Sequence, residues 1–132
     1  MAIAVLLYRL TGGRFGGKVL GLRVLLLTTT GRKTGKQRTT PLGYFEQDGG
    51  YVIIGSNAGS DTHPGWFHNL RSDPHVTVEV KNKQSEASAE IAGTDRRGQL
   101  WSQLIELAPG YSNYAKRTSR EIPVVILSLE KA

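Results

Sequence analysis

Short runs of apolar and β-branched residues, each bounded by Gly, Pro, Asn or Asp, divide most of this chain into predicted strands. The segments with this pattern are residues 24–30, 38–46, 51–56, 76–80, 85–92 and 123–129. Residues 76–80 alternate between apolar and polar side chains, which is typical of a half-buried strand. Asp48-Gly49-Gly50 is a strong hairpin signal between two of these strands. Pro41 has no N–H for a sheet ladder, so we expect its strand to lie at an edge or to contain a bulge.

Helical spacing is confined to a few segments. The longest, residues 95–107, carries an apolar face and begins after Thr94, a candidate N-cap. Shorter helical segments are predicted at residues 2–10, 64–72 and 111–116, the last as a single turn. Either Thr62 or His63 would cap the helix that begins near Pro64. Because hairpins dominate and strands do not alternate with helices, the pattern predicts a mainly β fold, an antiparallel barrel with one longer and two short helices outside it.

A chain of 132 residues fits one folded domain. Glycine pairs at 12–13 and 16–17 predict a flexible connection, which separates an N-terminal helix and linker (residues 1–20) from a barrel domain (residues 21–132). The absence of Cys excludes disulfides and thiolate sites, and three scattered His predict no metal site. No apolar stretch approaches the ~20 residues of a membrane-spanning helix. Residues 1–20 mix apolar and basic side chains, so they would either lie on an anionic membrane surface or pack on the domain.

Positive charge is concentrated in the first third of the chain. The first 45 residues carry eight Lys or Arg and no Asp or Glu, whereas the rest carries nine Lys or Arg and eleven Asp or Glu. Half of the basic residues of this third lie in one octet, residues 31–38, between two predicted strands. Four cations so close repel one another unless an anion is present, and the glycines of the octet let backbone N–H groups turn inward. The octet therefore predicts a site for a multiply charged anion, the alternative being an exposed basic turn.

Three further segments are candidates for ligand contacts. Residues 56–60 are small and follow a core strand, so they either admit a flat ligand close to the backbone or form a tolerant loop. Trp66 would stack on a heterocycle or fill the core. Tyr111 and Tyr114 share one side of a turn and would form an aromatic wall with phenol donors or pack at a helix end. The chain shows no Ser-His-Asp set and no paired carboxylates, which argues against a hydrolase.

Taken in order, these motifs resemble the deazaflavin-dependent nitroreductase family. The segments that carry the resemblance are residues 25–35 with Arg38 and Pro41, 56–59, 63–71, 73–74, 109–111 and 120–124. No single segment is decisive, but the ordered set covers nearly all of residues 20–127 and is highly specific. The resemblance implies a split β-barrel of the flavin-reductase-like type that binds the reduced 8-hydroxy-5-deazaflavin coenzyme F-420. That coenzyme carries a phosphate and a tail of glutamates, which agrees with the anion site predicted from the octet.

The resemblance also assigns residues by motif position. The phosphate end would be held by Arg32, Lys33, Thr34 and Arg38. The ring and its linker would be lined by Pro41, Leu42, Ser56, Asn57, Ala58, Gly59, Pro64, Trp66 and Asn69. Tyr111 and Tyr114 would border the acceptor pocket. The chain departs from the nitroimidazole-reducing pattern where it has Asn57 in place of Lys, and Gly43 and Ala108 in place of Tyr. A quinone or an unsaturated lipid or terpenoid is therefore expected as an acceptor at least as much as a nitroimidazole.

The resulting hypothesis is an oxidoreductase that transfers a hydride from the coenzyme to a small organic acceptor, a quinone, enone or nitro compound. Tyr111 or Ser56 would donate a proton or polarise a carbonyl, and solvent would serve equally as the proton source. Three alternatives stay open: a non-catalytic carrier of the deazaflavin or of a lipid, a flavin mononucleotide reductase on the same barrel, and a polyanion-surface protein that uses residues 1–38.

Partners and location follow from the same residues. Aromatic side chains are not interleaved with the octet, so no specific nucleic-acid partner is predicted. The protein is expected in the cytoplasm, either free or in contact with the inner face of the membrane through residues 1–20. Monomer and homodimer both remain open.

Overall fold

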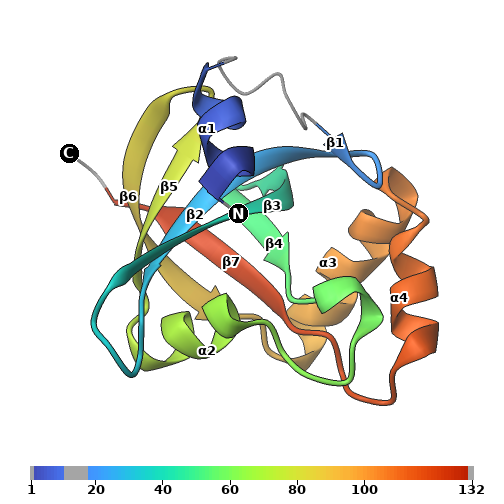
Figure 1. Ribbon diagram of the computed structural model, residues 1–132. Coiled ribbons are helices and arrows are strands. Elements are labelled where there is room, and N and C mark those ends of the chain that lie inside the picture. Colours follow the sequence, from blue (N-terminus) through green and yellow to red (C-terminus); the bar gives the residue numbers. More distant parts are fainter. Residues whose placement is uncertain (1, 11–17, 131–132) are drawn as a thin grey trace.

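The computed structural model describes residues 2–10 and 18–130 and shows a β-barrel with helices packed around it (Figure 1). In chain order the elements are α1 (Ala2–Leu10), β1 (Lys18–Val19), β2 (Leu22–Thr30), β3 (Gln37–Gln47), β4 (Gly50–Ile54), the 3-10 helix η1 (Asn57–Gly59), α2 (Gly65–Ser72), β5 (His75–Val80), β6 (Lys83–Ile91), α3 (Thr94–Leu107), α4 (Tyr111–Arg117) and β7 (Val124–Leu129). Each predicted strand corresponds to an observed one, with ends that agree within two residues. The predicted glycine-rich connection lies outside the described residues, and the division at residue 20 stays a prediction.

Six antiparallel strands close the barrel, which confirms the predicted fold class. Neighbouring strands follow the order β2-β3-β4-β7-β6-β5, and β5 pairs back to β2. Asp48 and Gly49, with φ of 53° and 78°, form the tight turn between β3 and β4, so the predicted hairpin is confirmed. Lys81 and Asn82, with φ of 50° and 68°, form the turn between β5 and β6. Left-handed residues at both turn positions match the right-handed twist of the flanking strands.

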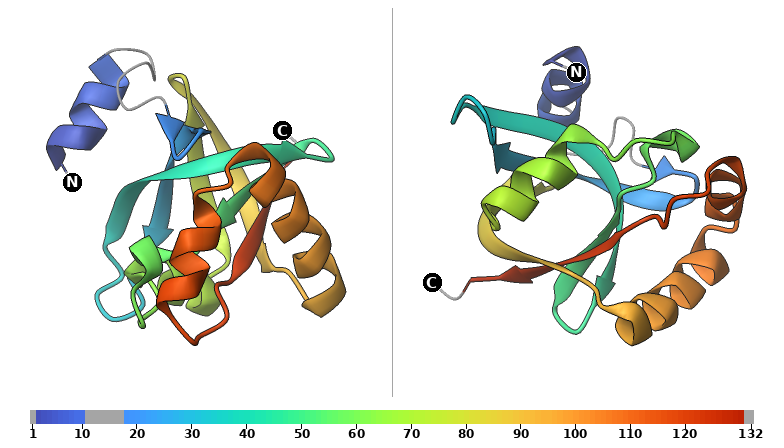
Figure 2. Two further views of the ribbon diagram at one scale, coloured as in Figure 1. Left: turned by 90° about the vertical axis from the view of Figure 1, so that its right-hand side faces the viewer. Right: turned by 90° about the horizontal axis from the view of Figure 1, so that it is seen from below.

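Helix α2 closes one end of the barrel, as the right-hand view of Figure 2 shows. Its buried side chains Trp66, Phe67 and Leu70 join the interior apolar cluster, which includes Leu25 and Leu127 from the barrel wall. The apolar residues of α2 therefore serve the same core as the inward-facing residues of the strands.

Helix α3 packs on the outside of the barrel (Figure 2). Leu100 and Leu104 are fully buried in a second apolar cluster with Val52 and Val124 from β4 and β7. The strands β4 and β7 thus carry apolar side chains on both faces. Each face covers a different core, which explains why the segments read as nearly continuous apolar runs.

Helix α1 packs on the outer face of β2 (Figure 1). The Tyr8 hydroxyl donates to the carbonyl oxygen of Val24 at 2.9 Å and accepts from the N–H of Lys81 at 3.2 Å. Arg9 Nε lies 3.3 Å from the carboxylate of Glu79, whose side chain is only 7% exposed. Within the described residues, no helix is long and apolar enough to cross a membrane.

Four details of the elements differ from the prediction. Residues predicted as a single turn continue into α4, and the two-residue strand β1 was not predicted. Gly93, not Thr94, is the N-cap of α3, and no side chain caps that helix. Pro64 takes the cap position of α2, which begins at Gly65, and the side chains of Thr62 and His63 contact Ser60 and Arg120 instead.

Candidate functional site

A pocket of about 620 Å³ opens beside the first half of β3. This half pairs only with β2, because pairing with β4 begins at Tyr44, so one edge of the strand is free there. Pro41 lies in this singly paired half, as expected for a residue without an N–H. The lining residues are Arg38, Thr40, Pro41, Leu42, Gly43, Ile54, Ser56, Asn57, Ala58, His63, Pro64, Gly65, Trp66, Asn69, Tyr111 and Tyr114.

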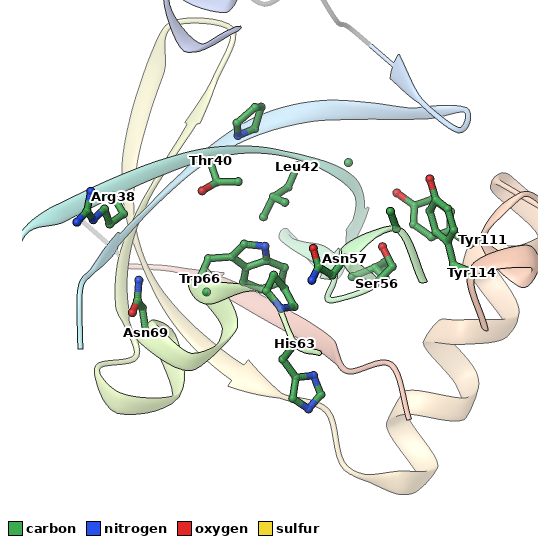
Figure 3. A pocket seen from close by; sticks show the side chains of 16 residues that line it. Arg38, Thr40, Leu42, Ser56, Asn57, His63, Trp66, Asn69, Tyr111 and Tyr114 are labelled. Carbon is green, nitrogen blue, oxygen red and sulfur yellow. The ribbon is translucent and has the colours of Figure 1, made fainter. Parts of the chain in front are cut away.

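The pocket is elongated and its two ends differ in chemistry (Figure 3). Arg38 and Asn69 lie at one end, and Tyr111 and Tyr114 lie at the other. Trp66 lies between the two ends, is only 7% exposed, and belongs to the interior cluster as well as to the pocket wall. Both roles proposed for this Trp from the sequence, core residue and flat wall, are therefore compatible with its position.

The loop after β4 holds an unusual backbone conformation. Ser56 is right-handed helical, whereas Asn57, Ala58 and Gly59 have φ of 46°, 54° and 80°. A right-handed residue followed by a left-handed one turns successive N–H groups to one side, which is the geometry of an anion- or carbonyl-binding nest. For Asn57 and Ala58 this conformation costs about 1–2 kcal/mol each, so the surrounding structure must hold it in place.

Arg120 is the residue that holds this loop, and it contacts four of its positions. Nη1 and Nη2 donate to the carbonyl oxygen of Gly55 at 3.2 and 3.1 Å, and Nη2 also donates to that of Ser56 at 2.9 Å. Nε donates to the carbonyl oxygen of Ser60 at 2.9 Å, and Nη1 lies 3.1 Å from Nδ1 of His63. The five contacts match the five N–H groups of a guanidinium, so every donor of the side chain has a partner.

His63 lines the pocket as a neutral imidazole. Its burial, together with the positive charge of Arg120, lowers its pKa below the ordinary value. Because the guanidinium can only donate, Nδ1 accepts and the ring proton resides on Nε2.

The tyrosine pair closes the other end of the pocket. Tyr111 is buried and meets Tyr114 edge to face, with ring centroids 5.7 Å apart. Burial, with a smaller contribution from Tyr114, raises the pKa of Tyr111 to about 12. The phenol is therefore neutral at physiological pH and can donate a hydrogen bond. Gly43 makes room for it, since a Cβ at that position would lie 2.9 Å from the Tyr111 hydroxyl.

The basic turn forms a second hollow next to the Arg38 end. Arg32 and Lys33 line this hollow of about 400 Å³ together with His68, Arg71 and Ser72 of α2. Asn69 joins the two compartments: its Oδ1 accepts from the N–H of Arg32 at 3.1 Å, and its Nδ2 donates to Thr29 Oγ1 at 3.2 Å.

The structure thus gathers most residues that the resemblance assigned to the site. The predicted residues that line the main pocket are Arg38, Pro41, Leu42, Ser56, Asn57, Ala58, Pro64, Trp66, Asn69, Tyr111 and Tyr114. Arg32 and Lys33 line the neighbouring hollow, not the pocket. Thr34 is exposed and accepts from the N–H of Lys36 within the turn, and Gly59 faces Arg117 and Tyr114 of α4. Neither of these two lines a hollow, so their assigned roles stay predictions.

Sequence reasoning did not single out several lining residues. They are Thr40, Ile54, His63 and Gly65 in the pocket, and His68 and Arg71 in the hollow. Thr40 could have been predicted, because side chains two positions apart on a strand share a face and Thr40 lies between Arg38 and Leu42 in this spacing. Arg120 begins one of the segments that carry the family resemblance, but no local signal marks it as the residue that holds a loop 57 to 65 positions away.

The residue types fit a flat ligand with an anionic end. Neither the pocket nor the hollow has an acidic lining residue, and three Arg and one Lys lie at the Arg38 end. Apolar and polar side chains share the rest of the wall, and the volume lies within the usual range for cofactor sites. No group of three His, Asp or Glu that could hold a metal ion occurs among residues 2–10 and 18–130.

A family model and two curated proteins that resemble this chain carry the same functional description. Residues 1–129 match the family model described as F420H(2)-dependent quinone reductase. An F420H(2)-dependent quinone reductase of Mycobacterium tuberculosis is 41% identical over 126 residues, which cover 92% of this chain and 85% of that protein. A second protein of that species, described as a putative enzyme of the same kind, is 29% identical over 103 residues, 78% of this chain and 87% of its own length.

Solved structures agree with this match. A structure described as an F420-H2 dependent reductase superposes with a TM-score of 0.72 at 35% identity, covering 80% of this chain and 93% of its own. A structure described as a domain-swapped dimer superposes with a TM-score of 0.75 at 32% identity, covering 96% of this chain and 97% of its own. A haem storage protein of Vibrio cholerae, 16% identical with a TM-score of 0.58 over 93% of this chain and 89% of its own, shares the fold alone.

Proposed function

This chain belongs to the F420H(2)-dependent quinone reductase family, and we propose that its pocket binds reduced coenzyme F-420 and catalyses hydride transfer to a quinone. One observation of the structure supports this most directly. A pocket lined about equally by apolar and polar groups, with Trp66 in its wall, lies next to a cationic hollow across Asn69, and neither has an acidic lining residue. A long ligand with a planar ring and an anionic end suits both compartments at once.

The expected dependence on the deazaflavin coenzyme is confirmed by the family, whose name gives quinones, not nitro compounds, as acceptors. Reduction of nitro compounds therefore remains part of the proposal. Asn57 and Gly43, which depart from the nitroimidazole-reducing pattern, both line the pocket, so differences in acceptor choice have a place in the structure where they act.

The binding residues divide by chemistry. Arg38, Arg32 and Lys33 would hold the anionic end, with Arg71 as a further cation on the same hollow. Charge-assisted hydrogen bonds of this kind contribute about 1.5–3 kcal/mol each. Leu42, Pro64 and Trp66 would contact the faces and edge of the ring, where apolar contact and exclusion of water matter more than charge.

The protein's contribution to the chemistry is placement and hydrogen bonding. When bound, the reduced coenzyme supplies a hydride, and the quinone needs one proton in addition to become a hydroquinone. The neutral Tyr111 phenol can donate a hydrogen bond to an acceptor oxygen at its end of the pocket, and the Ser56 hydroxyl can do so nearer the centre. With its pKa near 12, Tyr111 stays protonated and can polarise the oxygen, while the proton comes from Tyr111, Ser56 or solvent.

Titration with the coenzyme tests the site. We expect R32A to weaken coenzyme affinity by about ten-fold or more, since it removes a cation from the hollow. The matched control K36A removes the same charge from the same turn, where Lys36 is exposed and does not line the hollow, and should change the affinity less than three-fold. Quenching of coenzyme fluorescence measures both. If both variants weaken the affinity equally, the hollow is not a specific site and the coenzyme is attracted by the basic surface in general.

Turnover separates the remaining alternatives. Reduced coenzyme F-420 should be oxidised in the presence of a soluble quinone, and an enone and a nitro compound extend the panel. A non-catalytic carrier would bind the coenzyme without turnover. Tighter binding of flavin mononucleotide than of the deazaflavin would favour the flavin reductase.

Homodimer formation is the proposed assembly. A solved structure of 32% identity is described as a domain-swapped dimer, and α1 exposes Ile3, Leu6 and Leu10 at 74%, 56% and 72%. Burial of these side chains against a second copy would remove apolar surface from water. Sedimentation of the wild type and of a variant with Ser at the three positions tests this, and an unchanged dimer in the variant would exclude α1 from the interface.

The same exposed face supports a second proposal for residues 1–20, contact of a cytoplasmic protein with an anionic membrane. Arg9 lies beside the exposed apolar residues of α1 and is 46% exposed although it pairs with Glu79, so part of its guanidinium can still face an anionic surface. Flotation with anionic liposomes and with neutral ones distinguishes this from dimerisation. If the protein floats with neither kind of liposome, the membrane proposal is wrong and a protein partner would cover the apolar face of α1.

A further inference from the structure

The contacts of Arg120 determine which way two peptide groups of the pocket loop face. Its guanidinium binds the carbonyl oxygens of Gly55 and Ser56. These oxygens belong to the peptide groups whose N–H groups are those of Ser56 and Asn57. The peptide bonds are trans, so each N–H points opposite to its carbonyl and therefore away from the guanidinium. Ser56 and Asn57 line the pocket between Trp66 and the tyrosine pair (Figure 3).

Both N–H groups are available to a ligand. Across residues 2–10 and 18–130, no protein group accepts a hydrogen bond from the N–H of Ser56 or of Asn57. Ser56 is nevertheless only 8% exposed, so its polar backbone lies in a largely desolvated setting. For Ser56, an N–H without a protein acceptor is therefore costly unless water or a ligand supplies one, whereas Asn57 is exposed and its N–H is open to solvent or ligand.

The same guanidinium holds the strained part of the loop. It binds carbonyls before and after the left-handed run Asn57–Gly59, namely those of Ser56 and Ser60. On the outer side, Thr118 Oγ1 donates to Asp61 Oδ1 at 2.8 Å and so ties the loop to the segment that carries Arg120. A backbone in this conformation persists only when its surroundings over-determine it. Arg120 makes more of these contacts than any other side chain, and Arg117 Nη1 adds one to the carbonyl oxygen of Ala58 at 3.4 Å.

From this geometry we propose that Arg120 is a positioning residue that aims the N–H groups of Ser56 and Asn57 into the pocket, where they form a two-donor site for an electron-rich oxygen of the bound ligand. The identity of that ligand rests on the proposed function. The oxygen is a carbonyl or oxyanion oxygen, either of the coenzyme ring or of the quinone. The cation behind the two peptide groups polarises them in the direction that strengthens donation toward the pocket.

Two variants of Arg120 and one control arginine test the proposal. R120K keeps the charge but has one nitrogen, which cannot reach the carbonyls of Gly55, Ser56 and Ser60 together, and R120M removes charge and donors at similar volume. Arg97 is the control because it contacts the segment between α4 and β7 that also carries Arg120, with Nε donating to the carbonyl oxygen of Ile122 at 2.9 Å, and it lines neither the pocket nor the hollow. R97K therefore shows how ligand binding changes when the segment between α4 and β7 is loosened while Arg120 is kept.

The readout is the backbone amide resonances of Ser56 and Asn57. In the wild type and in R97K, ligand binding should shift both amide protons downfield, as expected when an N–H gains an acceptor. In R120K this ligand-induced shift should be lost, and the dissociation constant of the ligand should rise about ten-fold. A shift with the oxidised coenzyme alone assigns the oxygen to the coenzyme, whereas a shift that needs the quinone assigns it to the acceptor.

The outcomes separate this proposal from the proposed function. If R120K retains the ligand-induced shifts and wild-type affinity, the positioning role is overturned, even where its melting temperature falls. If R120M does not fold, R120K decides. If neither coenzyme nor quinone binds the wild type, the proposed function fails. The orienting role is then judged on ligand-free protein, where unchanged amide resonances of Ser56 and Asn57 in R120K would overturn it.

Discussion

At the residue scale, the chemistry of the site depends on how burial changes ordinary side chains. Tyr111 is 3% exposed and its pKa rises to about 12, mainly because burial disfavours the charged phenolate. The phenol therefore stays a hydrogen-bond donor over the whole physiological range. A folded-state pKa above the unfolded value of about 10 means that the folded protein holds this proton more tightly.

Replacing Tyr111 by Phe should alter stability at alkaline pH in a defined way. The stabilisation linked to the raised pKa is fully present below pH 10 and is lost as the pH rises toward 12. Between these values the wild type should lose about 2–3 kcal/mol more unfolding free energy than Y111F. Urea unfolding at several pH values measures this. Parallel curves for the two proteins would mean that Tyr111 titrates normally.

Gly43 and Tyr111 should be energetically coupled. A Cβ at Gly43 would lie 2.9 Å from the Tyr111 hydroxyl, so G43A should destabilise the protein by about 1–3 kcal/mol through overpacking. In the Y111F background the hydroxyl is gone, and the cost should fall by about 1 kcal/mol or more. The control is G98A in α3, where nothing lies within 4 Å and a gain of up to about 1 kcal/mol is expected. Additive effects of G43A and Y111F would contradict the coupling.

At the element scale, α1 depends on one ion pair that differs in burial from those on the surface. The carboxylate of Glu79 is 7% exposed and is contacted by Arg9 and by Gln84 Nε2, the latter at 3.1 Å. In the pair between Arg96 and Asp48 the carboxylate is instead 75% exposed, while the two arginines are similarly exposed, at 46% for Arg9 and 38% for Arg96. Removing a partner is costly only where the remaining charge stays buried.

We therefore expect R9A to destabilise the protein by about 1–3 kcal/mol and R96A by at most about 0.5 kcal/mol. The double variant R9A/E79Q should recover part of the loss, because it removes the unpaired carboxylate. Chemical denaturation measures all three. Equal losses for R9A and R96A would show that α1 gains nothing from the buried carboxylate.

At the scale of the whole molecule, the uneven charge has a specific consequence for binding. The first 45 residues carry eight basic side chains, and the structure places only part of them on the two compartments. Binding of a non-specific polyanion depends on the whole basic surface and collapses with salt. Binding of the coenzyme depends on a few directed contacts and on buried apolar area. Its affinity should therefore depend less on salt concentration.

Affinities at 50 and 500 mM salt test this difference. Coenzyme affinity should weaken by about ten-fold or less, whereas any affinity for duplex DNA should fall by about 10³-fold or more. The same steep fall for both ligands would favour the polyanion-surface alternative.

Much of the fold could be predicted from the sequence because its signals are local. Alternation and β-branched runs marked the strands, and Asp48-Gly49 marked a hairpin whose left-handed backbone few other residues adopt. Helix caps were predicted less well. Thr94 lies one position too far along α3, and His63 has a stronger partner in Arg120, a residue that no neighbouring position reveals.

The sequence by itself determined where the six barrel strands lie along the chain, the position of the basic turn and, through the family resemblance, most of the pocket residues. Only the tertiary structure decided which cations share a compartment, that Tyr111 meets Gly43, and that Arg120 reaches Gly55 across 65 positions. The reason is physical. Strand and turn preferences arise within a few neighbouring residues, whereas these contacts exist only once β5 pairs with β2, the barrel closes, and distant segments are brought together.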